Sequence, residues 1–183
     1  KAQVNLSAIP YYFRSKEGLY NATVGHIADV LAAHLTPFLE RLQTETANGF
    51  APETARVLLR EGLSTMVAVM CGDPGTMRFS QIILREQMAP TAAFDLIYPK
   101  VMERILSAFA TLIATITGET DTRQCNLQAI LLVGQVMVFR AGRATVIRRI
   151  GMAGYTAREI AEIQELVVSR AMAALDFMAG RQA

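Results

Sequence analysis

Apolar residues recur every three to four positions along most of the chain, which is the period of an α-helix. In the last segment this repeat gives one continuous stripe, made of Ile160, Ile163, Val167, Ala171, Ala174 and Met178. No run alternates strictly between apolar and polar residues, as a half-buried strand would, and no hairpin signal joins such runs. The pattern therefore predicts an all-α protein.

Proline, glycine and capping residues divide this pattern into seven predicted helices. Their ranges are Leu6–Phe13, Lys16–Thr46, Pro52–Met70, Thr76–Gln87, Thr91–Thr117, Asp121–Ile147 and Thr156–Ala179. Pro37 predicts a kink or break in the second helix, and Pro99 predicts a kink one turn earlier, near Asp95. Thr156 and Glu159 have the spacing of a capping box at the start of the last helix.

Composition narrows the class of protein. With 183 residues, 52% of them hydrophobic and 19% charged, the chain can bury a sizeable core in one domain or in a small domain joined to a medium one. The longest apolar stretch, Ala129–Phe139, is far shorter than the ~20 residues that cross a bilayer, so we expect neither a membrane span nor a signal peptide. The two cysteines form no CxxC pair, which favours a reducing, cytoplasmic compartment. A net charge of +2 permits a nucleic-acid partner without arguing for one.

The most informative stretch runs from Val4 to Tyr20, where a short helix is followed, after a tight turn, by a second capped helix. A helix this short is not stable alone, so its apolar edge, Ile9 and Phe13, must dock on neighbours. Small residues early in the helix and tyrosines late in it suit a DNA major groove, and Lys16 at the start of the next helix attracts phosphate. A helical hairpin with an aromatic core is the alternative.

These residues resemble the second half of the TetR-family helix-turn-helix, through Ile9, Tyr12-Phe13 and Ser15-Lys16-Glu17-Gly18-Leu19. The resemblance implies that Leu6–Phe13 is a DNA recognition helix and that two helices of the DNA-binding domain precede it, outside this sequence. The family usually carries Tyr where Pro10 stands, so we expect Tyr11 and Tyr12 to take over its contact with the DNA backbone. The DNA-binding residues implied in this way are Asn5, Ser7, Ala8, Pro10, Tyr11, Tyr12 and Lys16.

Two further stretches, Ile83–Tyr98 and Gly134–Arg143, resemble the CecR-type branch of the same family. The resemblance implies a TetR-like, all-α fold, with residues 1–36 as the rest of the DNA-binding domain plus the start of a connecting helix. Residues 37–183 are then the effector-binding and dimerisation domain, which forms a homodimer through the last two long helices. Both of those helices are apolar on more than one face, as a homodimer requires; a monomer with a fully buried hairpin is the alternative.

An effector pocket should be mostly apolar, with a few polar anchors. We expect it to be lined by residues from the middle third and the second-last helix: Met66, Met70, Arg85, Phe94, Tyr98, Met102, Gln135, Phe139, Arg140 and Arg143, with Gln87 as a further polar candidate. Methionine adapts to varied ligands, and Arg140 and Arg143 lie three apart, where they could hold an anionic group. The alternatives are a soft core for the methionines and, for the arginines, pairing with Glu86 or Asp95 or solvation.

No motif of a nucleotide-binding, hydrolytic, zinc or redox enzyme is present, so we expect neither catalysis, nor a cofactor, nor a metal. We expect instead a ligand-responsive transcriptional regulator, more specifically a repressor. Its homodimer binds a palindromic double-stranded DNA operator, and a small-molecule effector releases it; no membrane takes part. The sequence does not separate a repressor from an activator. The alternative from another class is a helical small-molecule-binding protein or enzyme on this fold that has lost DNA binding, for which Pro10 is the best support.

Overall fold

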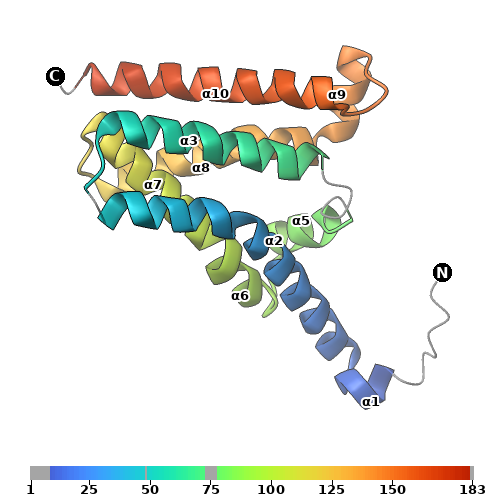
Figure 1. Cartoon of the computed structure of the whole chain (residues 1–183). Coiled ribbons are helices and arrows are strands. Elements are labelled where there is room, and N and C mark those ends of the chain that lie inside the picture. The colour runs from blue at the N-terminus through green and yellow to red at the C-terminus, as the bar shows by residue number, and fades with distance from the viewer. Residues whose placement is uncertain (1–8, 48, 73–77, 182–183) are drawn as a thin grey trace.

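The computed structural model describes residues 9–47, 49–72 and 78–181, and all regular structure within them is helical (Figure 1). In chain order the elements are α1 (Ile9–Phe13), α2 (Lys16–Ala47), α3 (Pro52–Val67), the π-helical η2 (Ala68–Gly72), α5 (Ser80–Met88), α6 (Phe94–Ile97), the π-helical η3 (Tyr98–Met102), α7 (Glu103–Thr117), α8 (Thr122–Ala141), α9 (Arg143–Ile150) and α10 (Ala157–Ala179). The all-α prediction is confirmed. No single helix among the described residues is long and apolar enough to cross a membrane. The segments Phe94–Thr117 and Thr122–Ala141 have the length and composition of a span only when taken together, and they are bent by 114° relative to each other.

Helices α3, α7, α8 and α10 form the body of the molecule, with α3 packed against both α7 and α10. Its tightest point is Gly62 on α3, where Phe38 of α2 and Phe109 of α7 meet edge to face, 6.2 Å between ring centroids. A Cβ at Gly62 would lie 2.9 Å from atoms of both rings, so a side chain would push the three helices apart. The close approach of α3 to α2 and α7 thus depends on this glycine.

The first half of α2 extends away from the body and carries α1 at its far end (Figure 1). Where α6 lies against this half, Val24 and Ala28 of α2 pack with Ala93 and Ile97 in a second, smaller apolar cluster. Helix α2 continues through Pro37 without a break, and Figure 1 shows it changing direction along its length, as a missing N–H bond inside a helix allows. One helix therefore connects the tip to the core.

Two predicted helices differ from the structure. The predicted helix Asp121–Ile147 is two helices, because the backbone leaves the helical region at Gly142, with a φ of −92° and a ψ of 15°; α8 ends there and α9 begins at Arg143. The predicted helix Thr91–Thr117 begins instead at Phe94, and its irregularity is the π-helical turn η3 that contains Pro99 rather than a kink near Asp95. A wider turn accommodates the proline ring and its missing N–H.

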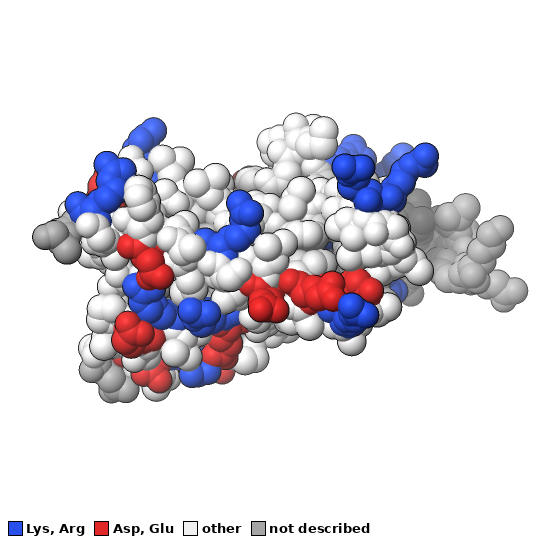
Figure 2. Space-filling view, turned by 90° about the horizontal axis from the view of Figure 1, so that it is seen from above, with Lys and Arg blue, Asp and Glu red and all other residues white. Residues whose placement is uncertain are grey.

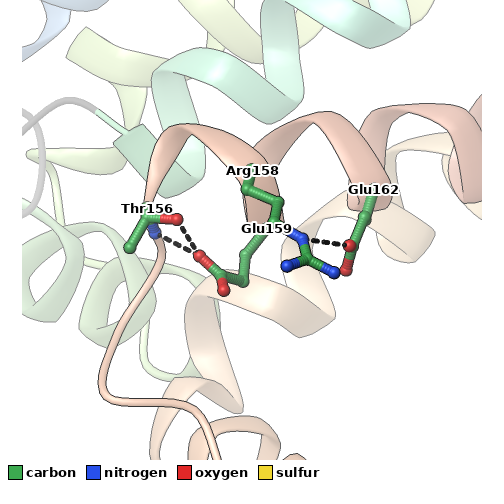
Figure 3. Close-up of polar contacts among 4 residues, drawn as sticks. All are labelled: Thr156, Arg158, Glu159 and Glu162. Carbon is green, nitrogen blue, oxygen red and sulfur yellow. Dashed lines mark hydrogen bonds and ion pairs between the residues drawn. The ribbon is translucent and has the colours of Figure 1, made fainter.

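The last helix begins with the predicted capping box, which is confirmed (Figure 3). The Thr156 N–H donates to Glu159 Oε2 at 2.9 Å, and the Thr156 hydroxyl donates to the same carboxylate. These hydrogen bonds hold the pKa of Glu159 below its ordinary value. One residue away on the same turn, Arg158 Nε donates to Glu162 Oε1 at 3.0 Å. The start of α10 is thereby held by local contacts as well as by its packing.

Candidate functional site

The turn between α1 and α2 brings the two helices close together. The Ser15 N–H donates to the Phe13 carbonyl at 2.7 Å, and Arg14 between them has a φ of 63°, in the left-handed region. Ser15 Oγ then accepts from the Gly18 N–H at 2.9 Å, as an N-cap of α2 does. A Cβ at Gly18 would lie 2.1 Å from the Phe13 carbonyl oxygen. The Ser and Gly of the N-terminal motif are therefore what permits this turn.

The α1 tip presents aromatic and basic side chains to solvent. Tyr11 is 82% exposed and Tyr12 is 73% exposed, with their rings edge to face at 5.0 Å, and Lys16 is exposed in the first turn of α2. The alternative of an aromatic core is thus wrong for these two rings. Of the other predicted DNA-binding residues, Pro10 belongs to α1, whereas Asn5, Ser7 and Ala8 lie outside the described residues.

A polar contact joins α2 to α5 just above this tip. Tyr20 Oη donates to Glu86 Oε1 at 2.6 Å, and the Thr91 N–H and hydroxyl both donate to Glu86 Oε2 at 2.9 Å. Glu86 is fully buried. Burial raises the pKa of its carboxyl, but the hydrogen bonds from Tyr20 and Thr91 outweigh this, so the pKa lies below its ordinary value. The same bond, followed by burial, raises the pKa of Tyr20.

An apolar cavity of about 120 Å³ has walls from α2, α3, α5, α6, α7, α8 and both π-helical segments. Its apolar lining residues are Leu31, Leu35, Phe38, Gly62, Met66, Val69, Met70, Ile83, Ile97, Val101, Met102, Ile105, Val133 and Met137, and its polar ones are His34, Thr65 and Gln87. Val69 and Met70 come from η2, and Val101 and Met102 come from η3. Single π-helical turns recur at functional sites, which marks this cavity as the candidate ligand site.

The predicted effector residues are not all brought together here. Met66, Met70 and Met102 line the cavity, while Arg140 lines a neighbouring cavity of about 40 Å³. Phe94, Tyr98, Gln135, Phe139, Arg85 and Arg143 contribute to the walls of neither. Sequence reasoning missed the α2 contribution, such as Leu31, and on α8 it chose other residues than Met137. For both residues the helical period gives no signal beyond that of ordinary core positions.

The arginines among these residues contact other groups. Arg85 lies over the Tyr20 ring at 5.5 Å, and Arg143 lies over the Tyr155 ring at 5.3 Å. Arg140 is buried and its Nη1 donates to the Met70 carbonyl at 2.5 Å, which satisfies an oxygen of the π-helical η2. The predicted alternative that Glu86 pairs with Arg140 or Arg143 is wrong, since Tyr20 and Thr91 occupy its carboxylate.

Helices α8 and α10 carry apolar side chains that point to solvent. On α8 they repeat at helical spacing along one stripe, and on α10 two more are separated by three turns; they are Leu127, Ile130, Leu131, Val138, Leu166 and Phe177. Figure 2 views the molecule from the α10 side, where the acidic side chains lie along one edge and a stretch of the surface carries no charge. This apolar surface has no cover within the described part of the chain.

Comparison with known proteins agrees with this arrangement. Residues 55–178 match the family model of the C-terminal domain of the HTH-type transcriptional dual regulator CecR. A curated relative, the HTH-type transcriptional dual regulator CecR of Shigella flexneri, is 33% identical over 173 residues, which cover 91% of this chain and 75% of the relative. An alignment of that length extends beyond residues 55–178. The chain therefore belongs to the CecR family of helix-turn-helix-type transcriptional regulators.

Proposed function

We propose that this protein binds an operator in double-stranded DNA as a homodimer and leaves it when a small molecule occupies the cavity. The observation that carries the proposal is the exposed α1 tip, where Tyr11 and Tyr12 project into solvent at the end of α2. A short helix held clear of the body by a long one is suited to enter a major groove. Repression follows wherever the operator overlaps a promoter; the relative's description as a dual regulator leaves room for activation elsewhere.

The chemistry of the tip fits a phosphate backbone and a groove. Tyrosine hydroxyls donate to phosphate oxygens, and Lys16 adds a cation beside the free N–H groups at the start of α2. Each Lys or Arg that neutralises a phosphate makes binding more dependent on salt. Tyr11, Tyr12 and Lys16 are therefore the residues whose removal should weaken operator binding.

The uncovered apolar surface of α8 and α10 supports the homodimer. Leu131 and Val138 lie two turns apart on α8, and each is more than half exposed. An apolar stripe at helical spacing on neighbouring helices is what a symmetric helical interface buries, since the same surface then meets itself. Two copies joined in this way would hold two α1 tips for two half-sites of a palindrome.

Release by an effector needs a physical link between the cavity and the tip. Ile83 and Gln87 of α5 line the cavity, and between them in sequence Glu86 holds Tyr20 of α2. On η3, Val101 and Met102 line the cavity, while the neighbouring Lys100 contacts Asp29 of α2, Nζ to Oδ1 2.5 Å. A ligand that displaces α5 or η3 therefore moves α2, and with it α1. This is a coupling free energy between two sites, carried by contacts at both ends.

The test is operator binding by the full-length protein, with the DNA selected from its own genome and the affinity measured across a salt series. Lys16→Ala should lower affinity and reduce the slope of log K against log salt by about one. Tyr11→Ala and Tyr12→Ala should also weaken binding. Arg60→Ala, which removes an exposed cation on α3, is the control and should change neither quantity. Absence of sequence-selective DNA binding at every salt concentration would refute the regulator. It would favour a small-molecule-binding protein or enzyme on this fold that has lost DNA binding.

A further inference from the structure

We propose that the cavity takes an uncharged, largely apolar molecule about the size of one fused ring system, with a hydrogen-bond donor that the side-chain carbonyl of Gln87 recognises. This inference rests on the proposed function, since it names the chemical class of the effector. It follows from three properties of the cavity: the charge of its walls, the hydrogen bonds its polar residues leave unused, and its volume.

None of the described residues that line the cavity is acidic, a lysine or an arginine. Of the three polar lining residues, His34 uses Nδ1 in a hydrogen bond with the Val30 carbonyl at 2.8 Å. An ionised ligand group would lose its hydration in this cavity and meet no opposite charge, which disfavours charged ligands strongly. The expected arginine anchors line other places: Arg85 and Arg143 lie over tyrosine rings. Arg140 lines the adjoining cavity of about 40 Å³, and its Nη1 donates to the Met70 carbonyl.

Two polar groups in the walls have hydrogen-bonding capacity left. Gln87 is an exposed residue at the rim of the cavity: its Nε2 donates to Met102 Sδ at 3.0 Å, a weak acceptor, and its side-chain carbonyl Oε1 has no partner within the described residues. The Thr65 hydroxyl, at the end of α3, likewise makes no hydrogen bond to the part of the chain that the structure covers. A carbonyl oxygen accepts, so the matching ligand group donates, and the hydroxyl can serve either role. Both groups are available to a ligand without breaking a contact of the fold.

The volume sets the scale of the ligand. A dry cavity of about 150 Å³ holds a benzene molecule in another protein, so about 120 Å³ here corresponds to a single small ring before any wall moves. Met66, Met70, Met102 and Met137 stand in the walls, and their unbranched side chains can shift to fit a somewhat larger ring. Indole, a bicyclic heteroaromatic molecule with a ring N–H, is uncharged, carries one hydrogen-bond donor and has this size.

The experiment measures dissociation constants by isothermal titration calorimetry on the full-length protein. Three probes of similar shape separate the effect of the hydrogen-bond donor on affinity from the effect of charge. Indole has the N–H donor, indene lacks it, and indole-3-carboxylate adds a negative charge. We expect indole to bind about tenfold more tightly than indene, which is the effect of one hydrogen bond. The carboxylate should bind at least a hundredfold more weakly than indole.

A variant locates the donor contact. Gln87→Leu should lower indole affinity to that of indene and leave indene within about twofold, while Gln81→Leu, on the exposed side of α5, should change neither. Circular dichroism on both variants confirms that they fold. The proposal is overturned by any of three results: no binding of indole, a carboxylate that binds as tightly as indole, or a preference for indole that survives Gln87→Leu.

Operator binding measured on the same preparation separates this proposal from the proposed function. Selective binding of indole by a protein that binds no DNA would refute the regulator and leave the ligand chemistry standing. Operator binding together with indole-3-carboxylate binding as tightly as indole would refute the ligand chemistry and leave the regulator standing.

Discussion

Tyr20 Oη and Glu86 Oε1 lie 2.6 Å apart and join two helices whose residues are 66 positions apart in the chain. The bond connects the second turn of α2 to the last turn of α5, where Glu86 stands in sequence between Ile83 and Gln87, two residues that line the cavity. Its acceptor is a fully buried carboxylate that depends on three donor groups for its charge. Removing one donor should therefore lower the free energy of unfolding and weaken the coupling between the cavity and α2.

Tyr20→Phe removes the hydroxyl and keeps the ring. Because hydrogen bonds to charged groups contribute about 1.5–3 kcal/mol, we expect a loss of that size in the free energy of unfolding measured by urea denaturation. Release of operator by a bound probe should also weaken, since the link between α5 and α2 is cut. Tyr12→Phe, at the exposed tip, is the control and should leave stability within about 0.5 kcal/mol. A Tyr20→Phe protein as stable as the control would contradict this.

The pH dependence of stability should report Glu86. Its pKa lies below the ordinary value in the folded protein, so the unfolded chain binds the proton more readily. Glu86 therefore stabilises the fold at pH values above its unfolded pKa, about 4.3, and this stabilisation is lost as pH falls through the lower folded value. The free-energy difference between wild type and Glu86→Gln should shrink as pH is lowered from about 6 to about 3. Glu40→Gln, with its exposed side chain on α2, should show no comparable change.

The periodicity of the chain predicted the long helices because helical spacing and caps are local properties. The capping box at Thr156 and Glu159 needs only residues three apart, and it is present as predicted. The division at Gly142 was missed because the residues on both sides continue the apolar repeat. At Gly142 the backbone leaves the helical region, with a φ of −92° and a ψ of 15°, and α8 ends there. The wide turns η2 and η3 have no sequence signature of this kind.

The candidate site divides in the same way. The α1 tip could be predicted from one continuous stretch, Val4 to Tyr20, because the residues that form the short helix, the turn and the start of α2 are all local to it. The cavity is assembled from segments that span residues 31 to 137, so no local pattern distinguishes its walls from the core. Met70 lies 70 residues from Arg140, and Tyr20 lies 66 residues from Glu86, so sequence reasoning could not pair them. The spacing of charged residues along a helix does not predict their hydrogen-bond partners when those partners come from distant parts of the chain.

Two glycines on neighbouring helices should respond oppositely to alanine. At Gly62 a Cβ would lie 2.9 Å from Phe38 and Phe109, so Gly62→Ala should lower the free energy of unfolding by about 1–3 kcal/mol through overpacking. At Gly25, in α2, a Cβ meets nothing within 4 Å, so Gly25→Ala should raise stability by about 0.4–1 kcal/mol by restricting the unfolded chain. Urea denaturation of both variants is the measurement. Equal effects of the two substitutions would refute the crowding assigned to Gly62.

The homodimer can be tested at a single residue of the α8 stripe. Leu131 is 60% exposed, and Val57 on α3, which lies outside the proposed interface, is 52% exposed. A glutamate at either position remains solvated in a monomer, so both variants should fold with similar stability.

In a symmetric dimer, Leu131→Glu places two carboxylates in one apolar interface, because each subunit contributes the same surface. Burying unpaired charges costs several kcal/mol, so we expect the dissociation constant of the dimer to rise at least a hundredfold. Val57→Glu should leave it unchanged. Sedimentation equilibrium across a concentration series gives both constants, and operator affinity should fall with the dimer because one tip alone reads only half a palindrome. A Leu131→Glu protein that stays dimeric at the wild-type concentration would place the interface elsewhere.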